Sequence, residues 1–251
     1  MRVILDRQRG GAYLSVAVPA VAIYGMYLFL TYYFQQVKGY SPITTGLAFL
    51  PLTVATVTAS VTANVKLLPR FGPRTLITTG MLLGAVGMLL LSRAGVHSGY
   101  VGSILPPTIV LGLGFGLIFG PPINVATARV DPGDSGVTSA MVNTMQQIGG
   151  SIGTALLSTL AVGATTAYLM SHHSHSPTAV SLAAVHGYQW AYLISCGIFL
   201  AGAALALSLL NGRSARDPAQ QPAGSGSDEP ASDSLMAHST LSTTQLPDLI
   251  R

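Results

Sequence analysis

The stretch LGLGFGLIFGPP, residues 111–122, is an apolar segment with glycine at every fourth position. Gly112, Gly116 and Gly120 share one face of a helix, because residues four apart are neighbours on a helix surface. Glycine on such a face lets the backbone of a second helix approach closely, as in bilayer-embedded helix pairs. Gly149 and Gly153 repeat the spacing later in the chain. We therefore expect transmembrane helices that pack through glycine faces.

The composition of the whole chain also indicates a membrane protein. Of its 251 residues 49% are hydrophobic and 8% charged, and the mean hydropathy is +0.54. Soluble domains carry roughly 25% charged residues. The single cysteine, Cys196, excludes an internal disulfide and a metal site built on paired thiolates. The sequence predicts neither a cofactor nor a metal.

Apolar windows of about 20 residues, long enough to cross about 30 Å of hydrocarbon, predict six spans. They run approximately over 12–35, 44–66, 74–93, 101–127, 136–168 and 186–210. The predicted fold is thus an all-α membrane protein, a bundle of six transmembrane helices within residues 1–212. Residues 213–251 are rich in Pro, Gly, Ser and acid, and such a composition predicts a disordered tail.

Basic residues predict the orientation of the bundle, because short loops rich in Lys and Arg stay in the cytoplasm. Most basic residues near the spans fall on one side, and only Lys38 and Arg93 fall on the other. We expect a multi-pass protein of the cell membrane with both termini in the cytoplasm. The positive net charge then reflects topology in the lipid bilayer and not nucleic-acid binding.

Polar stripes on three predicted helices suggest a cavity between helices. Their members are spaced by three and four residues, so each set shares one helix face. The candidate cavity residues of these stripes are Tyr24, Tyr27, Thr31, Gln35, Thr53, Thr56, Ser60, Asn143, Gln146 and Gln147. Asn124, which extends the glycine row of the fourth span, is a further candidate. The third and sixth spans carry far fewer polar groups. For a single Thr or Ser, a hydroxyl that bonds back to its own helix is the alternative explanation.

Four segments carry a resemblance to a known family, and one of them is LGLGFGLIFGPP (111–122), which is similar to one of its later helices. YGMYLFLTYYFQQVKGYSPITTGLAFLP (24–51) and SGVTSAMVNTMQQIGGSIGTALLSTL (135–160) resemble the carboxy-terminal six-helix half of major facilitator superfamily transporters, in particular the fourteen-span drug/proton antiporters. KLLPRFGPR (66–74) resembles a cytoplasmic loop motif of that family. Arg70, Gly72 and Arg74 match the motif, whereas Pro69 stands where the family places an acid.

The resemblance implies a multidrug-efflux transporter whose substrate is a small amphipathic or cationic molecule. It also implies an amino-terminal half, missing here or separate, because carriers of this type build the substrate site between two halves. A second copy of the chain is another possible partner. No Asp or Glu lies inside a predicted span, so the resemblance places the proton-coupling acids in the other half. An inactive truncated membrane protein remains an alternative.

An intramembrane serine protease is the rival function, because GDSG at 133–136 resembles the nucleophile motif of rhomboid-type enzymes and GGSIG at 149–153 fits G-x-S-x-G. A serine nucleophile needs a base within about 3 Å or one water away. We place Ser135 at the cytoplasmic end of the fifth span and His186 at the outer start of the sixth, so these two cannot meet. We therefore expect that the chain is not an enzyme.

Overall fold

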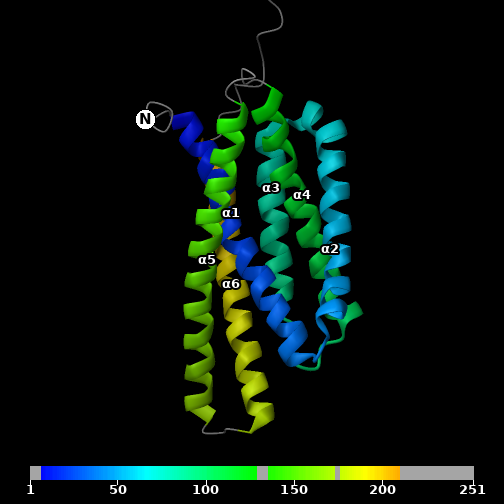
Figure 1. Cartoon of the computed structure of the whole chain (residues 1–251), viewed down its shortest axis with the longest axis vertical. Helices are drawn as coiled ribbons and strands as arrows, with labels where there is room; N and C mark the ends of the chain where they lie inside the picture. The colour runs from blue at the N-terminus through cyan, green and yellow to red at the C-terminus, as the bar shows by residue number, and fades with distance from the viewer. Residues whose placement is uncertain (1–6, 129–134, 173–175, 210–251) are drawn as a thin grey trace, which may run out of the picture. The chain divides into compact units, whose positions relative to one another are not determined.

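The computed structural model describes residues 7–128, 135–172 and 176–209, and nearly all of these residues are helical (Figure 1). Six α-helices follow one another: α1 (Arg7–Tyr32), α2 (Pro42–Thr62), α3 (Leu68–Leu91), α4 (Leu105–Ala128), α5 (Ser135–His172) and α6 (Pro177–Leu209). Three π-helical segments adjoin them: η1 (Tyr33–Val37), η2 (Ala63–Leu67) and η3 (Tyr100–Ile104). The predicted all-α six-helix bundle is confirmed. The predicted tail lies outside the described residues.

Serine caps followed by proline determine where two of the helices begin. Ser41 caps α2 by accepting a hydrogen bond from the Thr44 amide, and Pro42 follows it as the first helical residue. Ser176 accepts from the Ala179 amide in the same way at the start of α6. Such capping satisfies amides that have no partner inside the helix, and proline at the next position needs no amide partner. Helix α6 therefore begins ahead of residue 186, where hydropathy predicted the sixth span to start.

Within the described residues, five apolar helical stretches are long enough to cross a membrane, and one of them is long enough for two crossings. Pro42–Leu91, 50 residues long, includes both α2 and α3. The chain reverses within it at Gly72, whose φ of 73° lies in the left-handed region. A methyl group at Gly72 would meet no atom within 4 Å, so this glycine is needed for its backbone conformation and not for space.

The helices pack in two groups of three. Helix α1 packs against α5 and α6, and α5 also packs against α6. In the other group α4 lies between α2 and α3. The contact of α3 with α6 joins the groups, and Figure 1 shows α2 and α5 on opposite sides of the bundle.

Glycine faces form the contacts inside each group. A methyl group at Gly116 of α4 would lie 2.5 Å from the Thr56 carbonyl oxygen of α2. One at Gly149 of α5 would lie 2.5 Å from the Ala17 carbonyl oxygen of α1. Gly112 meets the Leu52 carbonyl, Gly120 meets Ser60 and Asn64, and Gly153 meets the backbone of Val21. The backbones of α2 and α4, and of α1 and α5, are therefore in direct contact.

Helix α3 meets its neighbours by the same means. A methyl group at Gly80 would lie 2.8 Å from the Gly114 carbonyl oxygen of α4, and one at Gly114 would lie 2.8 Å from the Gly80 carbonyl oxygen. Gly84 instead accommodates the ring of Phe199 of α6, which is fully buried. Gly80 and Gly84 lie four residues apart on one face of α3, where Gly80 forms a backbone contact with α4 and Gly84 leaves a socket for an aromatic ring of α6.

Replacing Gly116 by alanine should destabilise the bundle. The new methyl group would overlap the Thr56 carbonyl, and that backbone cannot move without shifting α2. We expect Gly116→Ala to lower the free energy of unfolding by about 1–3 kcal/mol, the usual range for overpacking. Reversible unfolding in mixed detergent micelles, followed by circular dichroism, measures this change.

Gly46→Ala is the matched control, because Gly46 lies in α2 and no atom lies within 4 Å of an added methyl group. Alanine also has the higher helix propensity, so this variant should be neutral or slightly more stable. Equal stability of the two variants would contradict the role assigned to Gly116.

Candidate functional site

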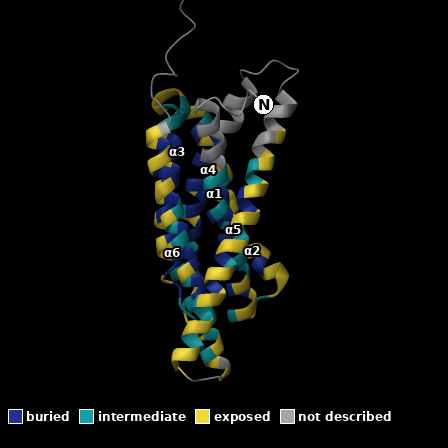
Figure 2. Ribbon diagram, turned by 90° about the vertical axis from the view of Figure 1, so that its left-hand side faces the viewer, coloured by how far each residue is buried: buried dark blue, intermediate teal, exposed yellow. Residues whose placement is uncertain are grey.

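The polar side chains predicted to line a cavity are accessible at the surface of the bundle. Figure 2 shows exposed residues along much of α5. Exposed members of the set are Tyr24, Tyr27, Gln35, Thr53, Asn143 and Gln147, and half-buried members are Thr31, Thr56, Ser60 and Gln146. Asn124 lies in α4, and its side chain is outside the described part of the structure.

Two tyrosines of α1 connect the polar stripes of neighbouring helices. Tyr24, 44% exposed, lies over Gly150 of α5, where an added methyl group would be 2.8 Å from its ring. Tyr27, 39% exposed, contacts Phe49 of α2 with ring centroids 5.4 Å apart. The sequence prediction missed Phe49, because its role depends on the crossing of α1 with α2. These contacts connect the stripes into one surface, which we call the wall. Its residues are Tyr24, Tyr27, Thr31 and Gln35 of α1 and its η1 extension, Phe49, Thr53, Thr56 and Ser60 of α2, and Asn143, Gln146 and Gln147 of α5.

The three threonine hydroxyls of the wall are already hydrogen-bonded within their own helices. Thr31 donates to the Tyr27 carbonyl (2.7 Å), Thr53 to that of Phe49 (3.3 Å) and Thr56 to that of Leu52 (2.8 Å). The alternative explanation thus holds for the hydrogen bonds of these threonines. The amides of Gln35, Asn143, Gln146 and Gln147 make no hydrogen bond to other described residues. These amides are the polar groups that the wall offers to a ligand.

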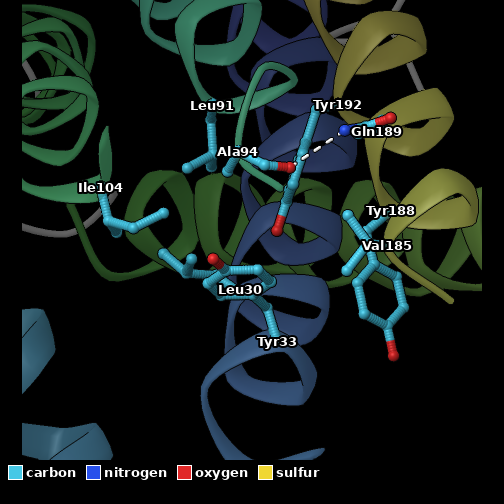
Figure 3. A pocket seen from close by; sticks show the side chains of 9 residues that line it. All are labelled: Leu30, Tyr33, Leu91, Ala94, Ile104, Val185, Tyr188, Gln189 and Tyr192. Atoms are coloured by element: carbon cyan, nitrogen blue, oxygen red, sulfur yellow. Dashed lines mark hydrogen bonds between the residues drawn. The ribbon is translucent and has the colours of Figure 1, made fainter. Parts of the chain in front are cut away.

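A small internal cavity lies between α1, α6 and the connection from α3 to η3, and Figure 3 shows the side chains around it. It is bounded by Leu30, Tyr33, Leu91, Ala94, Ile104, Val185, Tyr188, Gln189 and Tyr192. The space has no room for a water molecule. The buried Tyr192 hydroxyl has no hydrogen-bond partner among the described residues. This cavity cannot hold a substrate.

Three consecutive carbonyl groups beside that cavity each accept a hydrogen bond from a different side chain. Gln189 Nε2 donates to Ala94 (3.0 Å), the Tyr33 hydroxyl to Gly95 (2.9 Å) and Lys38 Nζ to Val96 (2.8 Å). Residues 94–96 follow α3, whereas the donors belong to α6, to η1 and to the residue after η1. We call this set of hydrogen bonds, from Tyr33, Lys38 and Gln189 to residues 94–96, the carbonyl clamp. It connects η1, α6 and the segment after α3 at one end of the bundle.

The loop motif lies at the opposite end, where α2 turns into α3. Arg70 is exposed, Gly72 makes the turn, and Arg74 donates a hydrogen bond to the Leu207 carbonyl near the end of α6. A cation at the carboxyl end of a helix satisfies a carbonyl and is favoured by the helix dipole. In this structure Arg74 therefore attaches the start of α3 to the end of α6.

The two serines of the protease hypothesis lack the geometry for catalysis. Ser135 is the first residue of α5, whereas the ring of His186 lies 5.0 Å from that of Tyr168 near the other end of the same helix. At 1.5 Å per residue these positions are about 50 Å apart. Ser151 lies in mid-helix and donates to the Ile148 carbonyl (3.0 Å). His186 lies inside α6 and is remote from Ser135.

The fold and the wall define a multi-pass membrane protein with one polar surface that its own helices leave open. The sequence profile of the Major Facilitator Superfamily matches residues 2–154, and the chain belongs to this superfamily. The resemblance stated from the sequence motifs is thereby confirmed.

Named relatives of this chain include drug-resistance, drug-export and drug-efflux proteins. The chain is 43% identical to a puromycin resistance protein of Streptomyces alboniger over 91% of its own length and 45% of that protein. It is 34% identical to a cephamycin export protein of Amycolatopsis lactamdurans, over 59% of the chain and 31% of that protein. It is 37% identical to a multidrug efflux pump of Mycolicibacterium smegmatis, over 56% of the chain and 27% of that protein. The chain thus spans less than half the length of each of these relatives.

Removing the cation of the carbonyl clamp should loosen the connection after α3. Lys38→Met leaves the Val96 carbonyl without its charged donor, and a hydrogen bond to a charged group contributes about 1.5–3 kcal/mol. We expect the amides of Ala94, Gly95 and Ser98 to exchange with deuterium about tenfold faster or more. Hydrogen-exchange mass spectrometry of the protein in detergent measures this rate.

Arg93→Met is the control, because Arg93 lies in the same connection and is exposed but takes no part in the clamp. This variant removes a cation at nearly the same place and should leave exchange unchanged. Equal acceleration in both variants would mean that general charge, and not the Lys38 hydrogen bond, holds the connection.

Proposed function

We propose that this chain acts as the carboxy-terminal half of a drug-efflux transporter of the fourteen-span drug/proton antiporter type. The observation that carries the proposal is the wall, on which aromatic rings and unpaired amides face outwards from transmembrane helices. Membership of the Major Facilitator Superfamily and the names of the relatives support the same function. The geometry around Ser135 and Ser151 gives no support to the protease alternative.

The chemistry of the wall suits small amphipathic or cationic substrates. Tyr24 and Tyr27 offer ring surface, which attracts both apolar groups and organic cations. Neutral amides such as Gln147 can donate or accept hydrogen bonds without fixing the charge of the ligand. Such a surface accommodates different drugs, because none of its groups demands one partner.

Transport in this proposal requires a second half. An alternating-access site lies between two halves that move against each other, and this wall is one side of such a site. The described helices contain no Asp or Glu, so the group that couples transport to protons belongs to the partner. That partner is an amino-terminal half, in the same longer protein or separate. A second copy of the chain could supply a second wall, but its helices would add no acid.

The proposed orientation places the protein in the plasma membrane with both termini in the cytoplasm. In a Cys196→Ser background, His97→Cys lies in the connection after α3 and should react with a membrane-impermeant maleimide added to intact cells. Phe71→Cys, at the turn between α2 and α3, should react only after the cells are opened. Both positions are exposed, so a difference in labelling reports only on which side of the membrane each one lies. The opposite pattern of labelling would reverse the orientation.

Transport is tested by joining the chain behind the amino-terminal half of the Streptomyces alboniger relative. We expect the fusion to raise the puromycin tolerance of a sensitive bacterium, and we expect the chain alone to have no effect. Tyr27→Ala in the fusion removes an aromatic contact of about 1 kcal/mol, which corresponds to a roughly fivefold loss of apparent affinity.

Leu89→Ala is the matched control, since Leu89 of α3 is 43% exposed but lies outside the wall. It should leave tolerance unchanged. A fusion that inserts and purifies as a single species yet gives no tolerance would refute the proposed function. Tolerance given by the chain alone would refute the need for a second half.

A further inference from the structure

A groove of about 720 Å³ lies between the later part of α5 and the earlier part of α6, helices that run side by side in Figure 1. Its lining changes along its length. Leu160 and Ala164 of α5 and Ile194 of α6 form an apolar end, whereas Ser171 and His172 lie at the other end. The groove is therefore apolar at one end and polar at the other, as an amphiphilic molecule is.

Four rings form the middle and the polar end of the groove. Tyr168 stacks on His172 with centroids 4.1 Å apart, and His186 lies 5.0 Å from Tyr168. Trp190 stands edge-on to His186 at 6.5 Å. Two residues come from each helix, four apart in each case. Because His172 covers the Tyr168 ring, little of that face is left for an organic cation.

The hydrogen bonds of these rings leave two donors of the groove lining without a partner among the described residues. Trp190 Nε1 donates to His186 Nε2 (3.2 Å), and an indole N–H can only donate. A neutral His186 therefore carries its proton on Nδ1. Neither His186 Nδ1 nor the Tyr168 hydroxyl has a partner among the described residues. No carboxylate is present in that part of the chain to repel an anion.

The groove lies at the depth of the membrane–water interface. Gln189, which precedes Trp190, donates to Ala94 in the connection after α3, and the neighbouring Arg93 is exposed. Charged residues in a connection mark the edge of the hydrocarbon, and Trp and Tyr gather at the same level. An apolar end pointing into the hydrocarbon and a donor-rich end at the interface match the position of a lipid.

We propose that this groove binds one membrane phospholipid. The phosphate accepts hydrogen bonds from the Tyr168 hydroxyl and His186 Nδ1, and an acyl chain lies along Leu160, Ala164 and Ile194. Phosphate oxygens are strong acceptors, and the groove supplies donors without a competing anion. The site is separate from the wall, and the proposal does not depend on drug transport.

The lone tryptophan of the chain, Trp190, reports on the site directly. Purified protein in detergent is titrated with phosphatidylglycerol whose acyl chains are brominated, because bromine in contact with an indole quenches its fluorescence. We expect saturable quenching that unbrominated phosphatidylglycerol reverses. Brominated diacylglycerol, which lacks the phosphate, should bind about tenfold more weakly, a difference of about 1.4 kcal/mol.

Two variants test the two ends of the groove. Ala164→Leu fills the apolar end and should weaken quenching by phosphatidylglycerol about tenfold, whereas Ala155→Leu, exposed on α5 outside the groove, should not. Tyr168→Phe removes a hydrogen-bond donor to the phosphate but keeps the ring. It should therefore reduce the difference in affinity between phosphatidylglycerol and diacylglycerol.

Three results would overturn the proposal. Quenching that rises linearly with lipid and is equal in Ala164→Leu and Ala155→Leu would show only general lipid contact. Displacement by tetraphenylphosphonium but not by phosphatidylglycerol would make the groove a cation site. Displacement by inorganic phosphate alone would make it a site for the free anion.

Discussion

Direct backbone contact between helices, permitted by glycine, is the constraint on which the rest of this bundle depends. In hydrocarbon there is no hydrophobic force to hold helices together, so close packing must do so. Gly116 against Thr56 and Gly149 against Ala17 bring two pairs of helices to the shortest separation that a backbone allows. Because the packed faces are occupied by glycine, larger polar side chains such as Tyr24 project at the edges of these contacts. The wall is therefore a consequence of the packing.

The two ends of the bundle are held by cations that bind carbonyl groups. Lys38 donates to Val96 at one end, and Arg74 donates to Leu207 at the other. The described residues contain no carboxylate, so neither cation has an acidic partner there. A carbonyl is a weaker partner than a carboxylate, but it lies at a fixed place on the backbone. Each cation thus connects segments far apart in the sequence without an ion pair that a change of pH could break.

The sequence predicted those features that depend on spacing along a helix. The glycine faces and the polar stripes follow from residues three or four apart, and the six helices follow from apolar windows of about 20 residues. Features that depend on contacts between helices were missed, including Phe49 beside Tyr27 and the carbonyl clamp on residues 94–96. The serine cap before α6 was also missed, because hydropathy is insensitive to it. The i, i+4 pairs Tyr168–His172 and His186–Trp190 were visible signals, but only the structure brings them together.

The wall has a property that an isolated bundle in lipid could not tolerate. The amides of Asn143, Gln146 and Gln147 lack partners among the described residues, and hydrocarbon chains cannot supply any. An unpaired polar group in hydrocarbon is unfavourable by several kcal/mol, so such a surface must face water or protein. The threonines of the wall escape this cost because their hydroxyls bond to their own helices. The amides do not, and we infer that they are the part of the wall that requires either an aqueous path or a second half against it.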